Sequence, residues 1–236
     1  MNSDQPSRNL LLQALPTEEF EVLRPRLELV ELTKDAVLVE AGAALSHVYL
    51  PLSGVISMVV RLSEGQTVEV AMVGRDSLFG ASAALDGGIS LTDAVVVLPG
   101  TAAILNVADF RAAAERSAAL RALLARHEQA LFAQAQQSAA CNASHTVEAR
   151  LSRCLLRVRD LCDSETLPLT QEFLAQMIGV QRNAVSIVAH ALQQARIIRY
   201  SRGHIEIKDV DGLRQTSCEC YRVVKAQRDR LLKAPD

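Results

Sequence analysis

The sequence lacks a long apolar run and a signal-like N-terminus. Apolar stretches such as residues 94–98 end well short of the roughly 18 residues that a membrane-spanning helix requires. The first residues include Asp4 and only a short apolar run at 10–12, whereas a secretory signal has a basic start and about 7–15 apolar residues. We therefore expect a cytoplasmic protein with no membrane partner.

The sequence also lacks an excess of charge and has no cysteine before Cys141. With 25 basic and 27 acidic residues and 49% hydrophobic residues, it is neither disordered nor a uniformly basic nucleic-acid coat protein. The five cysteines are an odd number, and a disulfide framework is not expected in a chain of 236 residues without a signal sequence.

The length and the distribution of charge favour two domains. At about 100–200 residues per domain, the length alone predicts one or two. Residues 1–144 carry 10 basic and 16 acidic residues, a net charge of −6, whereas residues 145–236 carry 15 and 11, a net charge of +4. This asymmetry indicates two domains with different partners, unless it is ordinary scatter.

Short runs rich in Val, Ile and Leu, separated by glycines, fill the first half. They predict strands at residues 27–32, 36–39, 47–52, 54–62, 66–73 and 94–98, with a hairpin turn at 63–65. Short strands at nearly regular spacing are typical of a closed barrel or a sandwich. A helix over residues 9–23, broken by Pro16, is expected before the barrel.

Strong helix formers without Gly or Pro predict a long helix from residue 108 to about 140. Steps of four and three residues mark a seam on it, formed by Leu120, Leu124, His127, Leu131, Gln134, Ser138 and Cys141. Such a heptad is typical of dimerisation, and we assign Leu120, Leu124, His127 and Leu131 to a dimer interface. The alternative is that the seam packs on the chain's own barrel. A second helix over residues 146–162 is expected to hold its arginines, at 150, 153, 157 and 159, mostly outside.

Residues 167–207 carry the most informative pattern, two short amphipathic helices joined by a glycine turn. Thr170 is a candidate N-cap of the first helix, and Gly179 ends it at a position that favours positive φ. The second helix begins near Gln181 and is expected to bury Val185, Val188, Ala189 and Leu192. Strand-like runs at 197–200 and 204–208 then predict a hairpin wing. Together they predict a winged helix-turn-helix that binds DNA or, alternatively, another protein.

At these residues the chain resembles the Crp/Fnr family of bacterial transcription regulators. The resemblance covers the barrel, the long helix and the stretch L-T-x-x-x-L-A-x-x-x-G-V-x-R-x-x-V-S from Leu169 to Ser186. It implies an α+β fold with a cyclic-nucleotide-binding-like β-roll or jelly-roll barrel at 1–116, a dimerisation helix at 117–144 and a winged helix-turn-helix at 145–236. It also implies a homodimer on two-fold double-stranded DNA, a small-molecule effector in the barrel, and RNA polymerase as a partner.

The resemblance places DNA-binding residues at the start of the second helix and beside it. Gln181, Arg182, Asn183 and Ser186 fall where base edges of the major groove are reached. Arg182 suits guanine O6 and N7, or alternatively a phosphate, and Asn183 suits adenine. Asn183 and Ile187 stand where the family usually has Glu and Arg, so the family's usual target sequence is in doubt. Thr170, Gln171 and Arg202 match the positions at which family members contact DNA phosphates.

The barrel departs from the family's nucleotide-binding pattern. Cyclic-nucleotide-binding members have Gly-Glu, followed by an Arg-Ser/Thr-Ala triplet. Here the corresponding residues are Phe79, Gly80, Ala81, Thr92 and Asp93. Losing the Arg that pairs with the phosphate and adding the Asp93 charge predicts that neither cAMP nor cGMP binds usefully. We expect a degenerate pocket whose effector, if one exists, is not identified.

No cofactor or metal is expected from the spacing of Cys and His. The iron–sulfur cluster of Fnr-type members needs N-terminal cysteines, which this chain lacks. Haem is harder to exclude, because His47, His127 and His145 are conceivable ligands, although none lies in a specific haem motif. Cys218 and Cys220 are a close pair, and on a strand both thiols would lie on one side, which leaves open a redox or metal role. Without a second ligand pair, however, the spacing is not that of a zinc site.

The leading interpretation is a homodimeric, sequence-specific DNA-binding transcription regulator with no enzymatic activity. The alternative is a sensor module that binds another small ligand and acts through protein contacts. An enzyme built on the barrel is disfavoured, because the barrel has one histidine, His47, and metal-dependent barrels need several ligands.

Overall fold

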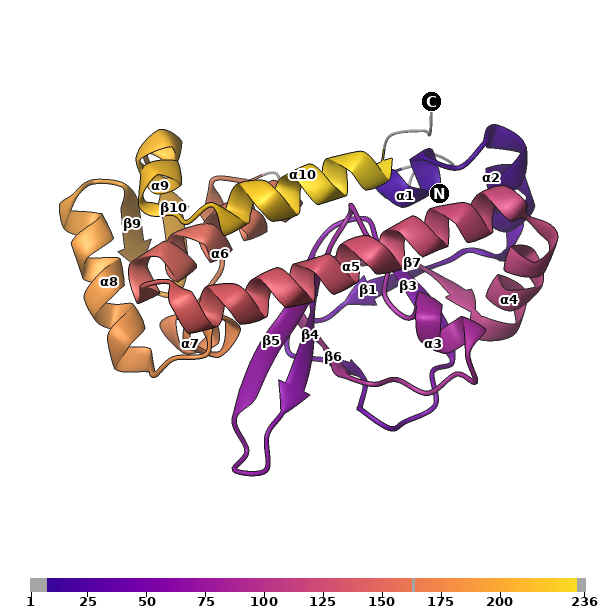
Figure 1. Cartoon of the computed structure of the whole chain (residues 1–236), viewed down its shortest axis with the longest axis horizontal. Coiled ribbons are helices and arrows are strands. Elements are labelled where there is room, and N and C mark those ends of the chain that lie inside the picture. Colours follow the sequence, from indigo (N-terminus) through magenta and orange to yellow (C-terminus); the bar gives the residue numbers. More distant parts are fainter. Residues whose placement is uncertain (1–7, 163, 233–236) are drawn as a thin grey trace.

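The computed structural model describes residues 8–162 and 164–232, and it shows a mixed α+β chain (Figure 1). A β-barrel is followed by a long helix and then by a helical domain that carries a small sheet. The strands are β1 (Glu28–Leu32), β2 (Val37–Val39), β3 (His47–Pro51), β4 (Val55–Arg61), β5 (Thr67–Val73), β6 (Asp93–Leu98), β7 (Gly100–Asn106), β8 (Thr166–Leu167), β9 (Ile198–Ser201) and β10 (His204–Ile207). The helices are α1 (Leu10–Gln13), α2 (Thr17–Leu23), the 3-10 turn η2 (Arg24–Arg26), α3 (Ala81–Leu85), α4 (Val107–Arg116), α5 (Ala118–Ser144), α6 (Val147–Cys162), α7 (Gln171–Ile178), α8 (Arg182–Gln194), α9 (Val210–Thr216) and α10 (Cys220–Leu232).

Two antiparallel sheets form the barrel, with strand orders β1-β7-β3 and β2-β6-β4-β5. The six strands predicted from the sequence are confirmed, and so is the 63–65 turn. There Gly65 has a φ of 83°, and the Leu62 N–H donates to the Gln66 carbonyl at 2.8 Å. Apolar side chains from both sheets, including Leu32, Ile56 and Val96, fill the space between them.

The strand β7 and the helix α3 are not predicted by the sequence pattern. β7 contains two consecutive Ala residues and ends at Asn106, which is also the N-cap of α4, so no Gly or Pro separates the strand from the helix and the pattern resembles the start of the helix. Its register between β1 and β3 shows that tertiary pairing makes these residues a strand.

The long helical region is two helices rather than one. Ser117 has an extended backbone between α4 and α5, and its Oγ accepts a hydrogen bond from the Leu120 N–H at 2.9 Å. Ser117 is therefore the N-cap of α5, a role that the continuous run of helix formers hides.

The predicted seam of α5 packs on the chain's own barrel, so its assignment to a dimer interface is corrected. Leu120 and Leu124 are 4% and 2% exposed in the cluster that covers the barrel, and Leu131 is half-buried beside the core between the sheets. His127 is 1% exposed and lies 2.7 Å from the Ser77 hydroxyl through its Nε2. One chain alone thus covers this face, which leaves it unavailable to a second copy.

The opposite face of α5 carries a second stripe with the same steps. Each of its members but the last lies two positions before a member of the predicted seam, and two positions rotate a helix by about 200°. The exposed stripe consists of Ala118, Ala122, Ala125, Gln129, Phe132, Gln136, Ala139 and Ala143. Phe132 is 65% exposed, which is unusual for a phenylalanine on a helix this well packed elsewhere.

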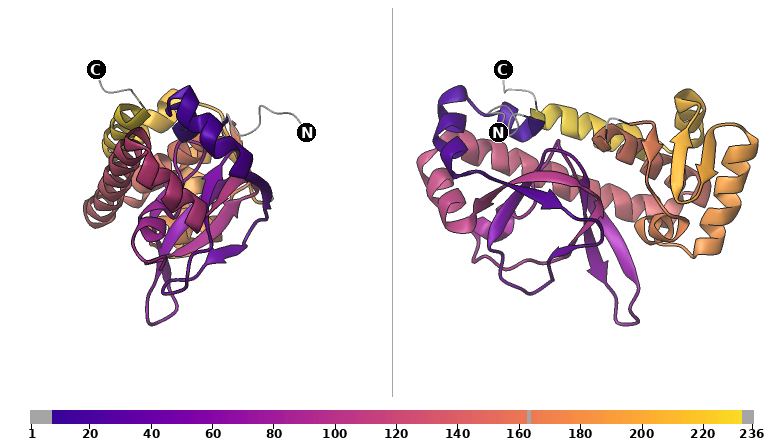
Figure 2. Two further views of the ribbon diagram at one scale, coloured as in Figure 1. Left: turned by 90° about the vertical axis from the view of Figure 1, so that its right-hand side faces the viewer. Right: turned by 180° about the vertical axis from the view of Figure 1, so that it is seen from behind.

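The C-terminal part packs α6 against α7, α8, α9 and the small sheet β8-β10-β9, around a core that includes Leu155, Leu174 and Leu192. The same core reaches barrel residues, among them Val55 and Met72, so the two parts are in contact. α10 then turns back and lies beside α5 (Figure 2).

The arginines of α6 are mostly buried, contrary to expectation. Arg150, Arg153 and Arg157 are each 8% exposed, because Arg153 and Arg157 lie between barrel residues and α10 and Arg150 lies against the end of α7. The Arg150 guanidinium donates to the Ile178 carbonyl, and Arg157 pairs with Asp76. Only Arg159 is half-exposed, as predicted, and it pairs with Glu165.

Candidate nucleic-acid interface

The helices α7 and α8 form the predicted helix-turn-helix. Thr170 caps α7, since its Oγ1 accepts from the Phe173 N–H at 3.2 Å, and Gly179 ends it with a φ of 61°. α8 buries Val185, Ala189 and Leu192, which fixes its opposite face toward solvent. In Figure 1, α8 stands at the end of the molecule remote from α4.

The outward face of α8 begins with three exposed polar residues, Gln181, Arg182 and Asn183. Gln181 is the N-cap but makes no side-chain cap hydrogen bond. The Arg182 guanidinium makes no ion pair with the described part of the chain. One turn further, Ile187 is 72% exposed in the middle of the same face, an apolar side chain without a partner in the described chain. This face is therefore free to meet another molecule.

The predicted contact residues Gln171 and Ser186 lie together and join the two helices. The Ser186 hydroxyl donates to Gln171 Oε1 at 2.6 Å. Ser186 is thus engaged within the protein, and the bond leaves the amide group of Gln171 as a donor toward solvent.

The wing places Arg202 beside the start of α7. Arg202 and Gly203 have φ values of 46° and 79° at the tip of the β9–β10 hairpin, as in the two-residue turns that match the strand twist. A Cβ at Gly203 would lie 3.8 Å from Thr170 Cγ2, so the wing tip adjoins the N-cap of α7. Arg202 is exposed, as are Arg196 and Arg199 shortly before it in the chain, which the sequence pattern does not single out.

The residues predicted for the effector pocket lie at two neighbouring places in the barrel. Phe79, Gly80 and Ala81 lead into α3, and Gly80 has a φ of 97° that explains the glycine. Asp93 is the first residue of β6, and the Thr92 carbonyl accepts from the Ser90 hydroxyl at 2.7 Å. Phe79, Ala81 and Asp93 are each at most 4% exposed.

The charge of Asp93 is compensated within the chain. Its carboxylate accepts from the Ala41 N–H at 2.8 Å and pairs with Arg61 at 2.7 Å. The Ala41 hydrogen bond, together with Arg61, lowers the pKa of Asp93 below its usual range. Repulsion between Asp93 and a phosphate is therefore weaker than expected from the sequence, and the case against cyclic nucleotides depends on the missing Glu and Arg.

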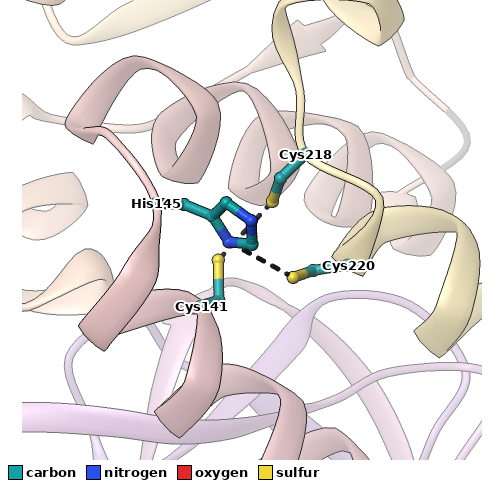
Figure 3. Close-up of side chains that lie close together, drawn as sticks. All are labelled: Cys141, His145, Cys218 and Cys220. Carbon is teal, nitrogen blue, oxygen red and sulfur yellow. Dashed lines mark hydrogen bonds between the residues drawn. The ribbon is translucent and has the colours of Figure 1, made fainter.

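A cluster of Cys141, His145, Cys218 and Cys220 forms a second concentration of chemically reactive groups (Figure 3). Cys218 and Cys220 lie before and at the start of α10 rather than on a strand. The end of α5 supplies Cys141 and His145, the second pair that the spacing of the sequence does not reveal. No second ligand pair for Cys218 and Cys220 is evident from the sequence, and the structure places Cys141 and His145 beside them.

Comparison with known families identifies both parts of the chain. The model of the cyclic nucleotide-binding domain matches residues 29–117, and that of the Crp-like helix-turn-helix domain matches residues 149–216. No curated protein matches the sequence.

Solved structures share the fold at low sequence identity. FixK2 from Bradyrhizobium japonicum has a TM-score of 0.70 at 17% identity, covering 81% of this chain and 98% of its own. TTHA1359, a CRP/FNR-family transcriptional regulator from Thermus thermophilus, has a TM-score of 0.67 at 22% identity, covering 80% and 98%. The c-di-GMP-responsive regulator CLP from Xanthomonas campestris has a TM-score of 0.66 at 13% identity, covering 81% and 99%.

A cyclic nucleotide-binding domain joined through a long helix to a Crp-like helix-turn-helix defines a two-part class of transcription regulator. The chain belongs to the Crp/Fnr family of that class. Within the described residues, none of the helices is long and apolar enough to cross a membrane.

Proposed function

We propose that the chain is a homodimeric, sequence-specific DNA-binding transcription regulator that does not respond to cAMP. The observation that carries the proposal is the exposed first turn of α8, where Arg182 and Asn183 face solvent without partners in the described chain. In helix-turn-helix proteins the first residues of the second helix meet base edges in the major groove. The parts of the chain at 1–116, 117–144 and 145–236 then act as effector domain, dimerisation helix and DNA-binding domain.

Each exposed side chain of α8 suits a particular partner in the groove. Arg182 donates two hydrogen bonds to guanine O6 and N7, or grips a phosphate, and Asn183 pairs with the adenine edge. Ile187, which is apolar and exposed, fits against a thymine methyl group. Thr170, Gln171 and Arg202 surround this face and are placed to hold phosphates.

The homodimer forms through the exposed stripe of α5. The stripe keeps heptad spacing over the whole helix, and its alanines allow two helices to approach closely around Phe132. Two-fold pairing there gives the dimer two α8 helices, one for each half-site of a two-fold DNA site.

The barrel takes an effector other than cAMP, or none. Ala81 and Thr92 replace the two residues whose side chains would bind ribose and phosphate, and Arg61 is already paired with Asp93. The similar regulator CLP is described as responsive to c-di-GMP, which supports a different ligand in a barrel of this fold. Calorimetric titration of the purified chain with cAMP is expected to show no micromolar binding.

Selection of bound fragments from genomic DNA by the purified chain tests the function. The expected result is a two-fold motif whose affinity falls steeply with salt, because Arg and Lys neutralise phosphates. Half-sites separated by about one helical turn, 10–10.5 base pairs from centre to centre, are expected from paired α8 helices.

The alternative is a sensor module that acts through protein contacts. The observation that favours it is the exposed Ile187, because apolar side chains on a free helix face are common where proteins dock. If the chain sediments as a dimer but the selection of genomic fragments at low salt enriches no DNA motif, this alternative is favoured.

A further inference from the structure

Four side chains that can bind a metal converge where α5 ends and α10 begins (Figure 3). Cys141 lies in the last turn of α5 and His145 is its C-cap, whereas Cys218 and Cys220 lie more than 70 residues further along the chain. One donor atom from each residue falls within 4.8 Å of all the others. The Sγ atoms of Cys141 and Cys218 are 3.5 Å apart, and Cys220 Sγ is 3.6 Å from His145 Nδ1.

The 3.5 Å and 3.6 Å separations are close to those between ligand atoms at the corners of a tetrahedron around one ion. With Zn–S bonds of about 2.3 Å and Zn–N bonds of about 2.0–2.1 Å, two sulfur ligands lie about 3.8 Å apart, and sulfur and nitrogen about 3.5 Å apart. A four-iron cluster binds each thiolate to a different iron and requires wider spacing. The geometry therefore selects a single ion.

The groups around the four donors fix the orientation of two of them. The Glu219 carboxylate lies 3.3 Å from His145 Nε2, which leaves Nδ1 to face the sulfur atoms. A carboxylate on the far nitrogen is the usual support of a metal-binding histidine. The Gln137 amide donates to Cys220 Sγ at 3.0 Å.

Burial makes the site closed. Cys141 and Cys220 are 0% exposed, Cys218 is 8% exposed and the His145 side chain is 25% exposed, so the three cysteines are shielded from solvent, and four protein ligands leave no coordination position for water. The Arg150 guanidinium donates to the Asn142 carbonyl, next to Cys141, at 3.3 Å, and this positive charge suits an ion with three thiolates and a net charge of −1. Cys154 and Cys162, by contrast, lie outside this cluster, in or against the apolar core of the C-terminal part.

We propose that Cys141, His145, Cys218 and Cys220 form a structural zinc site that ties α10 to the corner between α5 and α6. The Cys₃His set is one that structural zinc sites use, and four protein ligands complete it. The site joins the end of the long helix to the last helix, so the ion holds α10 along α5. The inference does not depend on DNA binding, because metal content and coordination are measured on the protein alone.

The test is metal analysis of the full chain, purified reduced from zinc-supplemented cells and desalted. We expect inductively coupled plasma mass spectrometry to find one zinc ion per chain. Replacement by Co²⁺ is expected to give the intense visible bands of a tetrahedral ion and a near-ultraviolet sulfur-to-cobalt band. Cys141→Ser and Cys218→Ser are each expected to lose the ion, and Cys162→Ser, a cysteine outside the cluster, to keep it.

His145→Cys separates coordination from folding. It preserves four ligands, so it is expected to retain zinc and to shift the cobalt bands, whereas His145→Ala loses most of the ion. Circular dichroism establishes that each variant is folded. The proposal is overturned if the folded wild-type chain retains no metal, if the Cys141→Ser and Cys218→Ser variants retain as much as wild type, or if intact mass shows a Cys141–Cys218 disulfide in place of the ion.

Discussion

Recognition of the DNA sequence in the proposed complex depends most directly on the Arg182 side chain. It is exposed at the first position of α8 and is not engaged by the described part of the chain. If it pairs with guanine, Arg182→Ala should weaken binding to the best site by about 1–3 kcal/mol and relax the preference at one base pair. Fluorescence anisotropy with the selected site and with single-base variants of it measures both effects.

Arg222→Ala is the matched control, because Arg222 is an exposed arginine on α10, away from α8. It should leave affinity and base preference unchanged. If Arg182→Ala lowers the affinity equally for every DNA sequence and makes its salt dependence shallower, Arg182 contacts a phosphate and recognises no base.

Glu69 is a buried carboxyl whose ionisation opposes folding. Burial raises its pKa from 4.5 to about 7, although the Ser57 hydroxyl, 2.6 Å away, and the Arg153 and Arg157 guanidiniums act in the opposite direction. Because the folded state holds the proton more tightly, this group makes the chain less stable as pH rises from about 4.5 through 7. Glu69→Gln should therefore gain about 3 kcal/mol of unfolding free energy relative to wild type between pH 4.5 and pH 8.

Urea unfolding at a series of pH values measures this difference. Glu64→Gln, at an exposed position of the β4–β5 turn, is the control and should follow the wild-type profile. A constant difference between Glu69→Gln and wild type at all pH values would mean that Glu69 keeps an ordinary pKa.

At the scale of elements, α5 shows why a heptad in the sequence does not identify its partner. Two stripes with identical spacing lie on opposite faces, and the more apolar one, with Leu120 and Leu124, covers the barrel. Phe132→Asp should therefore produce a folded monomer, whereas Leu124→Asp should unfold the chain, because it places a charge in a core position that is 2% exposed.

Sedimentation velocity and circular dichroism of both variants separate these outcomes. Leu91→Asp, at a residue that is 90% exposed in the barrel, controls for removal of an exposed apolar side chain and should remain dimeric. A Phe132→Asp chain that still sediments as a dimer would exclude the exposed stripe as the interface.

Local patterns in the sequence were sufficient for the helix-turn-helix and most of the barrel. Thr170 and Gly179 act through hydrogen bonds and backbone angles of their own segment, so their roles can be read from neighbouring residues. β7 could not be predicted this way, because its residues become a strand only through pairing with β1 and β3. The cysteine cluster was hidden for a similar reason, since Cys141 and Cys218 meet only after α10 folds back along α5.

At the scale of the whole molecule, a buried group of charges joins the barrel to the C-terminal part. Asp76, after β5, pairs with Arg157 of α6 at 2.6 Å and with Arg228 of α10 at 3.2 Å. Arg228 also lies 3.9 Å from Asp160, to which the Tyr221 hydroxyl donates at 2.9 Å. Residues from three distant segments thus share one charge network, so the position of the DNA-binding part relative to the barrel depends on it.

Asp76 is the carboxylate on which this network centres. Burial alone would raise its pKa, but Arg157 and Arg228 outweigh that effect and lower it below 3.8. The charged form thus stabilises the fold above about pH 4, and this contribution is lost as pH falls through the lowered pKa. At pH 7, Asp76→Asn leaves the buried Arg157 guanidinium without its ion-pair partner, whereas Arg228 keeps Asp160 and Asp229, and the change should cost about 3–5 kcal/mol of unfolding free energy.

Denaturant unfolding of Asp76→Asn at pH 7, with Asp86→Asn as an exposed control, measures that cost. Amide hydrogen exchange then shows which elements lose stability in the Asp76→Asn variant. Because Asp76 touches both α6 and α10, protection should fall in those helices and in β5 together, while the central strand β7, paired with β1 and β3, stays protected. A loss of protection confined to the barrel would mean that apolar contacts with Val55 and Met72 hold the C-terminal part in place. The ion pairs of Asp76 would then contribute nothing to its position.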